Sequence, residues 1–445
     1  MLLRFAVENI MSFKGVVEFN TFPSSKSHSH EWHKVACDYV TALRMSAIYG
    51  ANGAGKSNLL KCIALLKNLV LSEKIGDVEI GDDLCFKLDE NGKSNPSEIA
   101  IEFFSNGKIF YYHLRFNRHQ VFEEQLLLSQ KNKDITIFSR KDKDITVAGE
   151  YLRKGDSSDF VDVFMNAMNR IVRPDMLALS FFGKYYPTEL AIIKEAYDWI
   201  LRLQIVLPTM RIGHLPHVLD SDGEFAELVN SIVPELNTGI SRLSIRKEVI
   251  NEDESKGNLS IAKIIAKAKE NPGVPQLLLN SSSNEISNIV VEDGVPYLKT
   301  LVAIHTNYNG REVEMDMGLE SDGTRRLIEY MPLLYAVLKT DNVYVVDEIE
   351  RSIHPIMIKT IMSKISGNKD ARGQIIFTTH ESCLLDQSIF RPDEIWFAQK
   401  DVDQSTQLYP LSDYNIHKTA NIENGYLNGR YGGIPFLSNL TDLKW

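Results

Sequence analysis

The chain has 445 residues, of which 44% are hydrophobic and 24% are charged, a composition that is typical of folded, soluble proteins. Its length favours two or three domains over one compact core. With 49 basic and 59 acidic side chains the formal net charge is −10, which argues against a broad nucleic-acid-binding surface, although a local basic channel is compatible with it.

The sequence gives no signal for secretion or for a membrane span. Its first residues carry Arg4, Glu8 and Asn9 where a secretory segment needs an unbroken apolar run, and no later segment reaches the ~20 apolar residues of a membrane helix. The cysteines are far apart without CxxC spacing, so reduced thiols are expected. They are Cys37, Cys62, Cys85 and Cys383. We therefore expect a cytoplasmic protein without membrane contact.

Residues 1–75 are predicted to begin an α/β domain. The stretch "LLRFAVENIMSFKGVVEFN" predicts two short strands with a turn near Lys14 and Gly15. The following "RMSAIYGANGAGKSNLLKCIALLKNL" predicts an apolar strand, a Gly-rich turn and an amphipathic helix, the order of half a βαβ unit.

The middle of the chain changes pattern twice. Residues 76–150 alternate as strands of an antiparallel β subdomain, with "IAIEFFSNGKIFYYHLRF" a hairpin turning at Asn106 and Gly107. Residues 151–300 are predicted to form an inserted, mainly helical or mixed lobe, in which 250–295 is the most polar part and a candidate mobile region. No sustained heptads occur, which argues against a long coiled-coil arm.

Residues 301–445 return to α/β character. The strands "NVYVVDE" and "GQIIFTTH" have almost wholly apolar centres, as expected for parallel strands buried on both faces. The first and last parts of the chain are therefore predicted to share one sheet. The expected fold is an α/β P-loop fold with a mixed sheet, an antiparallel β subdomain and the inserted lobe.

The stretch "GANGAGKS" fits the P-loop pattern GxxxxGKS and lies between a strand and a helix, as that motif requires. Its glycines let backbone N–H groups surround a phosphate at the positive helix end, Lys56 reaches the outer phosphates and Ser57 supplies an oxygen to Mg²⁺. The predicted nucleotide-binding residues are Gly50, Asn52, Gly53, Gly55, Lys56, Ser57 and Asn58.

The stretch "VYVVDEIERSIHP" indicates which class of P-loop protein this is. An apolar strand ending in Asp347 places this carboxylate beside Mg²⁺, and Glu348 next to it can polarise an attacking water. No guanine-reading NKxD follows a strand in the usual position, so ATP is favoured over GTP. His380 ends another apolar strand; it is either a structural residue or, as its distance from the DE strand favours, a sensor of the γ-phosphate.

The stretch "LESDGTRR", before the apolar pattern "LIEYMPLLYAVL", has two interpretations. Ser321 or Asp322 can cap the N-terminus of the helix that follows. Alternatively, the stretch forms half of a binding site.

This series of motifs resembles the ABC-type ATPases, in particular the branch shared with SMC proteins, with 1–75 and 301–445 as the two parts of the ATPase head. "DEIERSIHP" resembles the overcoming-lysogenization-defect-like and RloA-like ATPases of bacterial phage defence, which include the ATPase of the phage anti-restriction-induced system. "RFAVENIMSFKGVVEFN", "ESDGTRRLIEYMPLL" and "NIENGYLNGRYGGIPF" are also similar to the stand-alone RloA-like branch. The resemblance covers both ends of the chain but not its middle third.

The resemblance implies roles for individual residues. Glu348 would be the catalytic base and His380 the switch, while Ser321 and Gly323 would contact the γ-phosphate held by a second subunit; Asp322 departs from the family's usual glycine. The loop after the DE strand would cross the dimer seam with Glu350, Arg351, Ser352 and His354. The family's glutamine between the lobes has no assigned position; the candidates are Gln120, Gln125, Gln130 and Gln204.

The expected function is an ATPase with bound ATP and Mg²⁺ that assembles with itself around ATP. In the leading hypothesis it is the sensor and scaffold of an anti-phage system that controls a separate effector nuclease or toxin, with a phage-encoded trigger as a further partner. An SMC-like repair ATPase acting on DNA is the alternative. A transporter's nucleotide-binding subunit is disfavoured by the long insertion and by the "IERSIHP" loop.

Three further features have weaker signals. His28, His30 and His33 lie near Cys37, but the spacing matches no usual zinc motif, so a solvated loop is favoured over a zinc site. Asp401 and Asp403 resemble the DxD pair of Toprim nucleases, but too few residues remain for a typical independent domain, so an acidic turn is favoured. "YLNGRYGGIPF" could stack a base, and a subunit contact is favoured.

Overall fold

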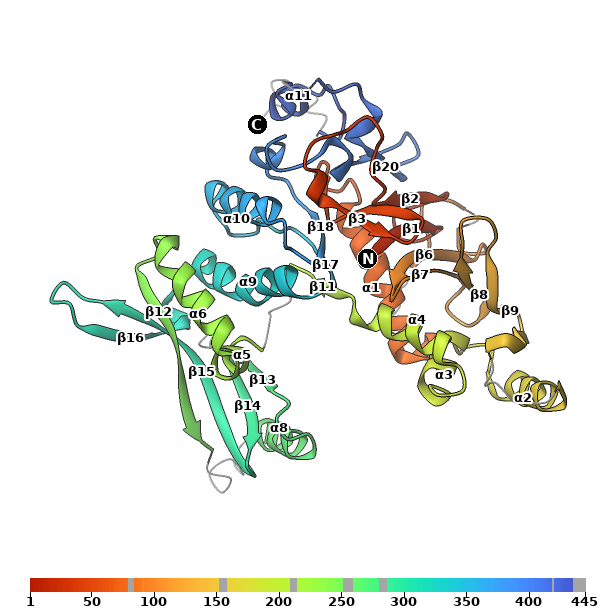
Figure 1. The fold of residues 1–445 in the computed structure, drawn as a ribbon, viewed down its shortest axis with the longest axis horizontal. Helices are drawn as coiled ribbons and strands as arrows, with labels where there is room; N and C mark the ends of the chain where they lie inside the picture. The colour runs from red at the N-terminus through yellow and green to blue at the C-terminus, as the bar shows by residue number, and fades with distance from the viewer. Residues whose placement is uncertain are drawn as a thin grey trace. The chain divides into compact units, whose positions relative to one another are not determined.

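The computed structural model describes residues 1–78, 84–90, 92–151, 158–208, 214–250, 259–279, 286–417 and 420–434 (Figure 1). The chain divides into two compact units. The first consists of Met1–Leu207, Val337–Ile349 and Ile361–Trp445, and the second of Pro208–Ala336 and Glu350–Thr360.

A six-stranded sheet in the first unit unites the two ends of the chain. Its order is β11-β17-β18-β5-β19-β20, parallel from β11 to β19, with β20 antiparallel to β19. The strands are β5 (Met45–Tyr49), β11 (Gln204–Val206), β17 (Val343–Val346), β18 (Gln374–Thr378), β19 (Ile395–Lys400) and β20 (Thr406–Pro410). Every residue of β5, β17 and β18 is buried, which matches the apolar runs in the sequence. The prediction of one sheet shared by the first and last parts is confirmed.

A seven-stranded antiparallel sheet forms the rest of the β structure of this unit, in the order β10-β9-β8-β7-β6-β1-β2. The strands are β1 (Leu2–Glu8), β2 (Val17–Asn20), β6 (Ser97–Ser105), β7 (Lys108–Phe116), β8 (Val121–Ser129), β9 (Ile135–Lys141) and β10 (Asp144–Val147). The predicted hairpin turns at Asn106 and Gly107, both of which have positive φ as a tight hairpin turn requires. A separate pair consists of β3 (Lys34–Cys37) and β4 (Val40–Leu43).

The helices that pack in this unit share a core with both sheets. They are α1 (Lys56–Ser72), α2 (Ser158–Ile171), α3 (Ala178–Tyr185) and α4 (Ala191–Arg202). The short helix α11 (Ile422–Leu427) also belongs to this unit and packs Tyr426 against Tyr49 and Phe397. The core cluster joins Leu59 and Ile63 of α1 to strand residues such as Phe5 and Ile376. Trp199 of α4 stacks on Phe103 of β6 with ring centroids 4.0 Å apart.

The inserted segment is organised differently from the sequence expectation. Residues 151–300 do not form one lobe, because the apolar faces of α3 and α4 pack in the core of the first unit and the second unit begins only at Pro208. A buried carboxylate helps to fix this arrangement: Glu124 on β8 accepts the first N–H groups of α3, from Ala178 at 2.7 Å and Leu179 at 2.8 Å.

The second unit has a five-stranded antiparallel sheet, so its described part is not mainly helical. The order is β12-β15-β14-β13, with β16 paired to β15. Its strands are β12 (Ile240–Val249), β13 (Gln276–Leu279), β14 (Ile286–Glu292), β15 (Val295–Thr306) and β16 (Glu312–Asp316). Its helices are α5 (Leu215–Ser221), α6 (Gly223–Ile232) and α8 (Leu259–Glu270).

Two helices run through both units: α9 (Asp322–Lys339) and α10 (Pro355–Gly367). Of the polar stretch 250–295, residues 251–258 and 280–285 lie outside the described residues, and the rest forms α8, β13 and β14. None of the helices described has the length and hydropathy needed to cross a membrane.

Candidate functional site: a P-loop at the carboxyl edge of the six-stranded sheet

The main sequence-predicted residues follow three neighbouring parallel strands. Gly50 comes directly after β5, Asp347 directly after β17, and His380 two residues after β18. Because the carboxyl ends of parallel strands lie at the same edge of a sheet, the fold brings the P-loop, the DE pair and the histidine together.

The P-loop has backbone conformations that favour glycine. Gly53 and Gly55 have φ values of 77° and 104°, in the left-handed region. A Cβ atom at Gly55 would overlap the side chain of Thr406, and one at Gly50 would lie 2.5 Å from the carbonyl oxygen of Ala398. The first N–H groups of α1 follow directly at Lys56, so the loop and the helix N-terminus form one anion-binding turn.

Lys56 is folded back into this turn. Its side chain is 5% exposed, and its Nζ donates to the carbonyl oxygens of Gly50 at 2.7 Å and Ala51 at 3.2 Å. The Nδ1 atom of His380 lies 3.5 Å from the same ammonium group. The charge therefore stands at the centre of the loop, beside the end of β18.

Asp347 and Glu348 are joined through one threonine. The Asp347 Oδ1 atom accepts from Ser57 Oγ at 3.0 Å and from Thr378 Oγ1 at 2.5 Å, and Thr378 Oγ1 in turn accepts the N–H of Glu348 at 2.8 Å. Asp347 is buried, whereas Glu348 is half-buried and has a left-handed backbone with φ of 50°. The two carboxylates thus have different environments. That of Asp347 is enclosed, whereas that of Glu348 is partly exposed and belongs to a residue with a constrained backbone.

His380 is exposed at the surface. Partial desolvation and the nearby Lys56 ammonium lower the pKa of this histidine below its ordinary value, against a smaller opposing effect of Asp347. A neutral imidazole at neutral pH can donate from one ring nitrogen and accept at the other.

The second unit contains the "LESDGTRR" turn and the loop after the DE strand. Ser321 Oγ accepts the N–H of Thr324 at 3.1 Å, so Ser321 caps α9. A Cβ atom at Gly323 would lie 2.5 Å from the carbonyl oxygen of Ser352, so this position requires glycine. Asp322 is exposed and bonds to Arg325.

The loop itself turns tightly before α10. The N–H of Ile353 bonds to the carbonyl of Glu350 at 2.8 Å, and Ser352 has a left-handed φ of 63°. His354 Nδ1 accepts the N–H of Ile356 at 3.3 Å. Arg351, Ser352 and His354 are exposed.

Comparison with known proteins agrees with these motifs. A family model described as "AAA domain, putative AbiEii toxin, Type IV TA system" matches residues 45–386, from β5 to just beyond His380. The chain belongs to this AAA family. A search of curated proteins finds no match.

Three solved structures of SMC heads are similar to this AAA protein. An SMC head bound to the C-terminal winged-helix domain of ScpA has 14% identity and a TM-score of 0.40, covering 92% of this chain and 97% of its own. The SMC head of Thermotoga maritima has 12% identity and a TM-score of 0.39, covering 93% and 99%. An SMC head with an extended coiled coil, bound to a ScpA domain derived from Pyrococcus furiosus, has 12% identity and a TM-score of 0.38, covering 92% and 96%.

Two residues beside the P-loop were missed by sequence reasoning, Ser12 and Thr406, which lie on either side of the matched range 45–386. Thr406 Oγ1 donates to the Ala54 carbonyl at 2.9 Å and lies 2.9 Å from Ser12 Oγ, whose hydroxyl can donate in return, and Asn58 Nδ2 donates to Ser12 Oγ at 2.9 Å. These two hydroxyl groups thus bond to the P-loop at Ala54 and to the first turn of α1 at Asn58. No sequence signal links them, because 394 residues separate Ser12 from Thr406.

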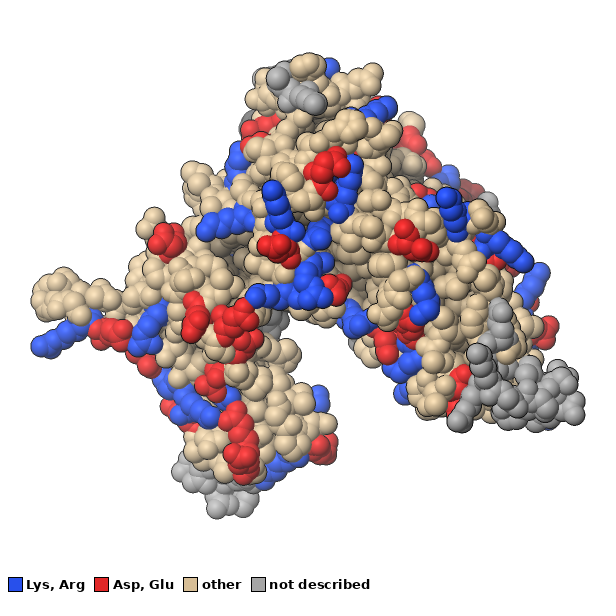
Figure 2. Space-filling view, viewed as in Figure 1, with Lys and Arg blue, Asp and Glu red and all other residues tan. Residues whose placement is uncertain are grey.

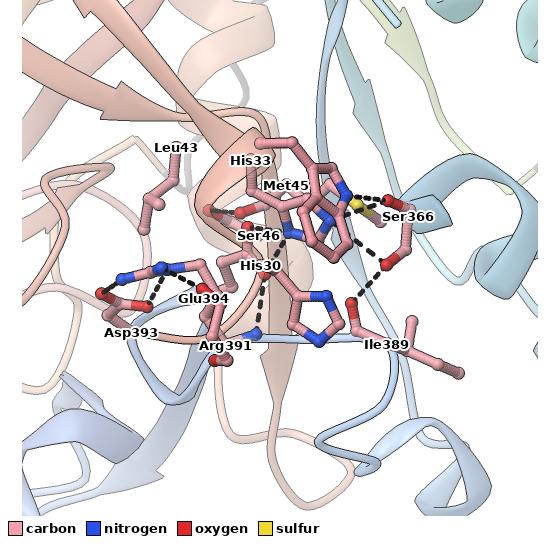
Figure 3. A network of polar contacts seen from close by, with 12 residues as sticks. His30, His33, Leu43, Met45, Ser46, Ser366, Ile389, Arg391, Asp393 and Glu394 are labelled. Carbon is pink, nitrogen blue, oxygen red and sulfur yellow. Dashed lines mark hydrogen bonds and ion pairs between the residues drawn. The ribbon is translucent and has the colours of Figure 1, made fainter. Parts of the chain in front are cut away.

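The expectation that the histidine cluster lies in a solvated loop is wrong for His33. Groups of metal-ligating His, Cys, Asp or Glu are absent from the part of the chain that the structure describes. His33 is nevertheless buried: Nδ1 lies 2.8 Å from Glu394 Oε1, and Nε2 lies 2.9 Å from the Ser366 carbonyl (Figure 3). Only His28 is exposed as a solvated loop residue would be.

The "DVD" stretch forms an acidic turn between β19 and β20, as predicted. Asp403 accepts the N–H of Ser405 at 3.0 Å and pairs with Lys14 at 3.2 Å. Hydrogen bonds from Ser405 and the Lys14 ammonium lower the pKa of Asp403 to about 2.

The C-terminal aromatic segment packs inside the chain, against the favoured subunit contact. Tyr426 and Tyr431 are buried, and both rings stack on Phe397 of β19. Arg430 is exposed, and residues 435–436 of the segment lie outside the described residues. Of the glutamine candidates, Gln204 lies on β11, next to β17, and the others lie on or beside β8.

Proposed function

We propose that this AAA protein is an ATP-hydrolysing switch that assembles with itself around ATP and controls a separate effector in anti-phage defence. The observation that carries the proposal is the convergence of Lys56, Ser57, Asp347, Glu348 and His380 at one edge of the six-stranded sheet. This set supplies a phosphate cradle, oxygen ligands and a base, which are the parts of phosphoryl transfer to water.

Different groups of the chain are proposed to bind different parts of the triphosphate. The N–H groups of the P-loop and the Lys56 ammonium bind the phosphates, and the buried position of Lys56 strengthens this attraction. His380, kept neutral by its lowered pKa, donates to the terminal phosphate and so reads whether it is present.

The residues beside Ser57 fit Mg²⁺. A hydroxyl and a buried carboxylate 3.0 Å apart, at the mouth of a phosphate-binding turn, are hard oxygen ligands of the kind that Mg²⁺ uses together with substrate phosphates. When bound, the ion neutralises charge that develops on the phosphate oxygens. Thr378 holds the Asp347 carboxylate in place for this role.

Glu348 is proposed as the general base. Its backbone is held by the bond from its N–H to Thr378 Oγ1 and by a left-handed φ, while its partial exposure admits water. As the water oxygen bonds to the terminal phosphorus, the bond from that phosphorus to the bridging oxygen breaks and ADP leaves, while the Glu348 carboxylate accepts the proton of the water.

Self-assembly is proposed to place Ser321 and Gly323 of one copy on the ATP of another. Ser321 is exposed at the α9 N-terminus, where an anion is favoured, and the close Ser352 carbonyl leaves no room for a side chain at Gly323. The exposed Arg351, Ser352 and His354 would then lie at the seam between copies.

The defence role rests on the RloA-like sequence resemblance and on the family description, which names a toxin of a toxin–antitoxin system. We propose that the effector nuclease or toxin is a separate chain. Direct action on DNA is less favoured, because Figure 2 shows basic and acidic side chains intermixed over the described residues of the face drawn. DNA-stimulated ATP hydrolysis would favour the repair alternative.

The assembly proposal is tested by measuring the mass of the Glu348→Gln variant in solution with and without ATP and Mg²⁺. We expect a dimer or larger species only with ATP, and a monomer for Lys56→Ala under the same conditions. Copurification with the products of adjacent genes tests the effector. A monomer at every ATP concentration, with no copurifying partner, would contradict the switch.

A further inference from the structure

The short helix α11 contacts both the end of β5 and the turn after β18, two segments beside the nucleotide site. Its Glu423 Oε1 accepts from Ser382 Oγ at 2.8 Å, and Ser382 lies two residues after His380. Its Tyr426 ring lies 5.9 Å from the ring of Tyr49, the last residue before the P-loop. The same helix therefore reaches the turn that follows β18 and the last residue of β5.

The hydrogen bond between Ser382 and Glu423 is one of several that join the segment after His380 to α11 and the residues before it. Gln387 Nε2 donates to the carbonyl oxygens of Ala420 at 2.9 Å and His417 at 3.2 Å, so the segment after His380 is tied to the segment before α11. The turn that carries His380 is itself held by a hydrogen bond, from the N–H of Glu381 to Thr379 Oγ1 at 3.0 Å. A shift of α11 would be transmitted through this turn.

The contact on the P-loop side is a packed aromatic cluster. Tyr49 is fully buried, and Tyr426 also stacks on Phe397 with centroids 5.5 Å apart. Tyr426 Oη donates to the carbonyl of Gly433 at 3.1 Å, which fixes the ring against the chain that follows α11. Close packing of this kind leaves the end of β5 little freedom.

We propose that α11 is a brace that positions the P-loop and His380, with Glu423 and Tyr426 as its positioning residues. The inference rests on the proposed function, because it assigns these residues to the same ATP site. Glu423 acts on turnover through the turn that carries His380. Tyr426 acts on nucleotide binding through Tyr49 and Gly50.

Steady-state kinetics separate the two effects. Glu423→Ala is expected to lower kcat about tenfold with little change in KM, since small displacements of a catalytic group are costly. Ser382→Ala should give the same loss, and the double variant no more than either alone, because both remove one bond. Glu423→Gln keeps an acceptor oxygen and should retain most of the activity. Tyr426→Leu should instead raise KM.

Two controls protect this result. Glu270→Ala changes an exposed glutamate of α8 in the second unit and should leave kcat and KM unchanged. If Glu423→Ala is not folded, Ser382→Ala tests the same bond without altering α11.

A spectroscopic measurement tests the brace without relying on hydrolysis. The imidazole resonances of His380, assigned by their loss in His380→Gln, should shift and titrate differently in Glu423→Ala but not in Glu270→Ala. If the wild-type protein hydrolyses no ATP, the proposed function fails while this measurement still reports on the brace. Unchanged His380 resonances together with unchanged kcat in Glu423→Ala and Ser382→Ala would overturn the inference.

Discussion

At the scale of single residues, the helix-capping role of Ser321 does not conflict with its proposed contact with the ATP of a second copy. Its Oγ caps α9 through the N–H of Thr324, so the capping interpretation of the sequence is correct as local structure. The cap leaves Ser321 exposed, next to a glycine that Ser352 makes obligatory. Both facts are compatible with a site completed by a second copy.

A pair of substitutions at Ser321 separates these roles. Ser321→Ala should lower the free energy of unfolding by about 1 kcal/mol, the usual cost of a lost N-cap. Ser321→Asp restores a capping oxygen, so thermal unfolding should return close to wild type, but its negative charge repels a phosphate. We expect neither variant to show ATP-dependent assembly by mass measurement. Full assembly of Ser321→Asp would mean that Ser321 is only a cap.

At the scale of elements, the position of the P-loop depends on contacts from distant segments. Thr406 of β20 and Ser12 of the β1–β2 connection meet behind the loop, and the N–H of Thr406 also bonds to the Ser12 carbonyl at 2.8 Å. The loop is thereby tied to both sheets of the first unit.

Thr406→Val keeps the shape of this side chain but removes its hydroxyl. The buried Ala54 carbonyl and Ser12 hydroxyl then lose a partner, at a cost of about 1–3 kcal/mol. We expect a lower melting temperature and weaker nucleotide binding, measured by calorimetry. Thr146→Val, at an exposed site on β10, is the matched control and should change neither quantity. Wild-type affinity in Thr406→Val would show that the Thr406 hydroxyl does not shape the P-loop.

The end of α10 is fixed by a second buried network (Figure 3). The Ser366 carbonyl accepts from Trp32 Nε1 at 2.7 Å and from His33 Nε2 at 2.9 Å. Burial acts to lower the pKa of His33, but the hydrogen bond and charge of Glu394 outweigh it, so the net pKa is raised above 6.5. A positive imidazolium at a helix C-terminus is also favoured by the helix dipole.

This network predicts a pH-dependent stability. Because the folded pKa of His33 is raised, its protonated form stabilises the fold fully below the unfolded pKa of about 6.5, and this contribution is lost as pH rises through the folded value. The difference in melting temperature between wild type and His33→Gln should therefore shrink from pH 6 to pH 9. His119→Gln, at an exposed turn, should show no such trend. A difference that stays constant over this range would contradict the protonated pair.

At the scale of the whole molecule, sequence patterns predicted which site residues lie together better than they predicted the boundaries of the two units. The P-loop, Asp347 and His380 were found because each follows an apolar strand within a few residues, and parallel strands bring such positions together. The limits of the second unit were not found. The amphipathic faces of α3 and α4 indicate burial but not which sheet they cover, and β11 is only three residues long.

Most of the other contacts that the sequence did not predict join residues far apart in the chain. Ser12 with Thr406 and His33 with Glu394 are each separated by more than 350 residues, so no local spacing reveals them. Tyr426 and Tyr431 were assigned to a subunit contact because composition cannot distinguish an intramolecular aromatic core from an interface.

The most direct test of the proposed ATPase is phosphate release from ATP with Mg²⁺, measured beside ATP affinity for wild type, Glu348→Gln and Glu270→Gln. Loss of the general base should lower turnover about 100-fold or more while ATP affinity stays near that of wild type. The exposed Glu270 should be dispensable for both. Wild-type phosphate release from Glu348→Gln, or no release from the wild-type protein, would contradict the assignment of this site.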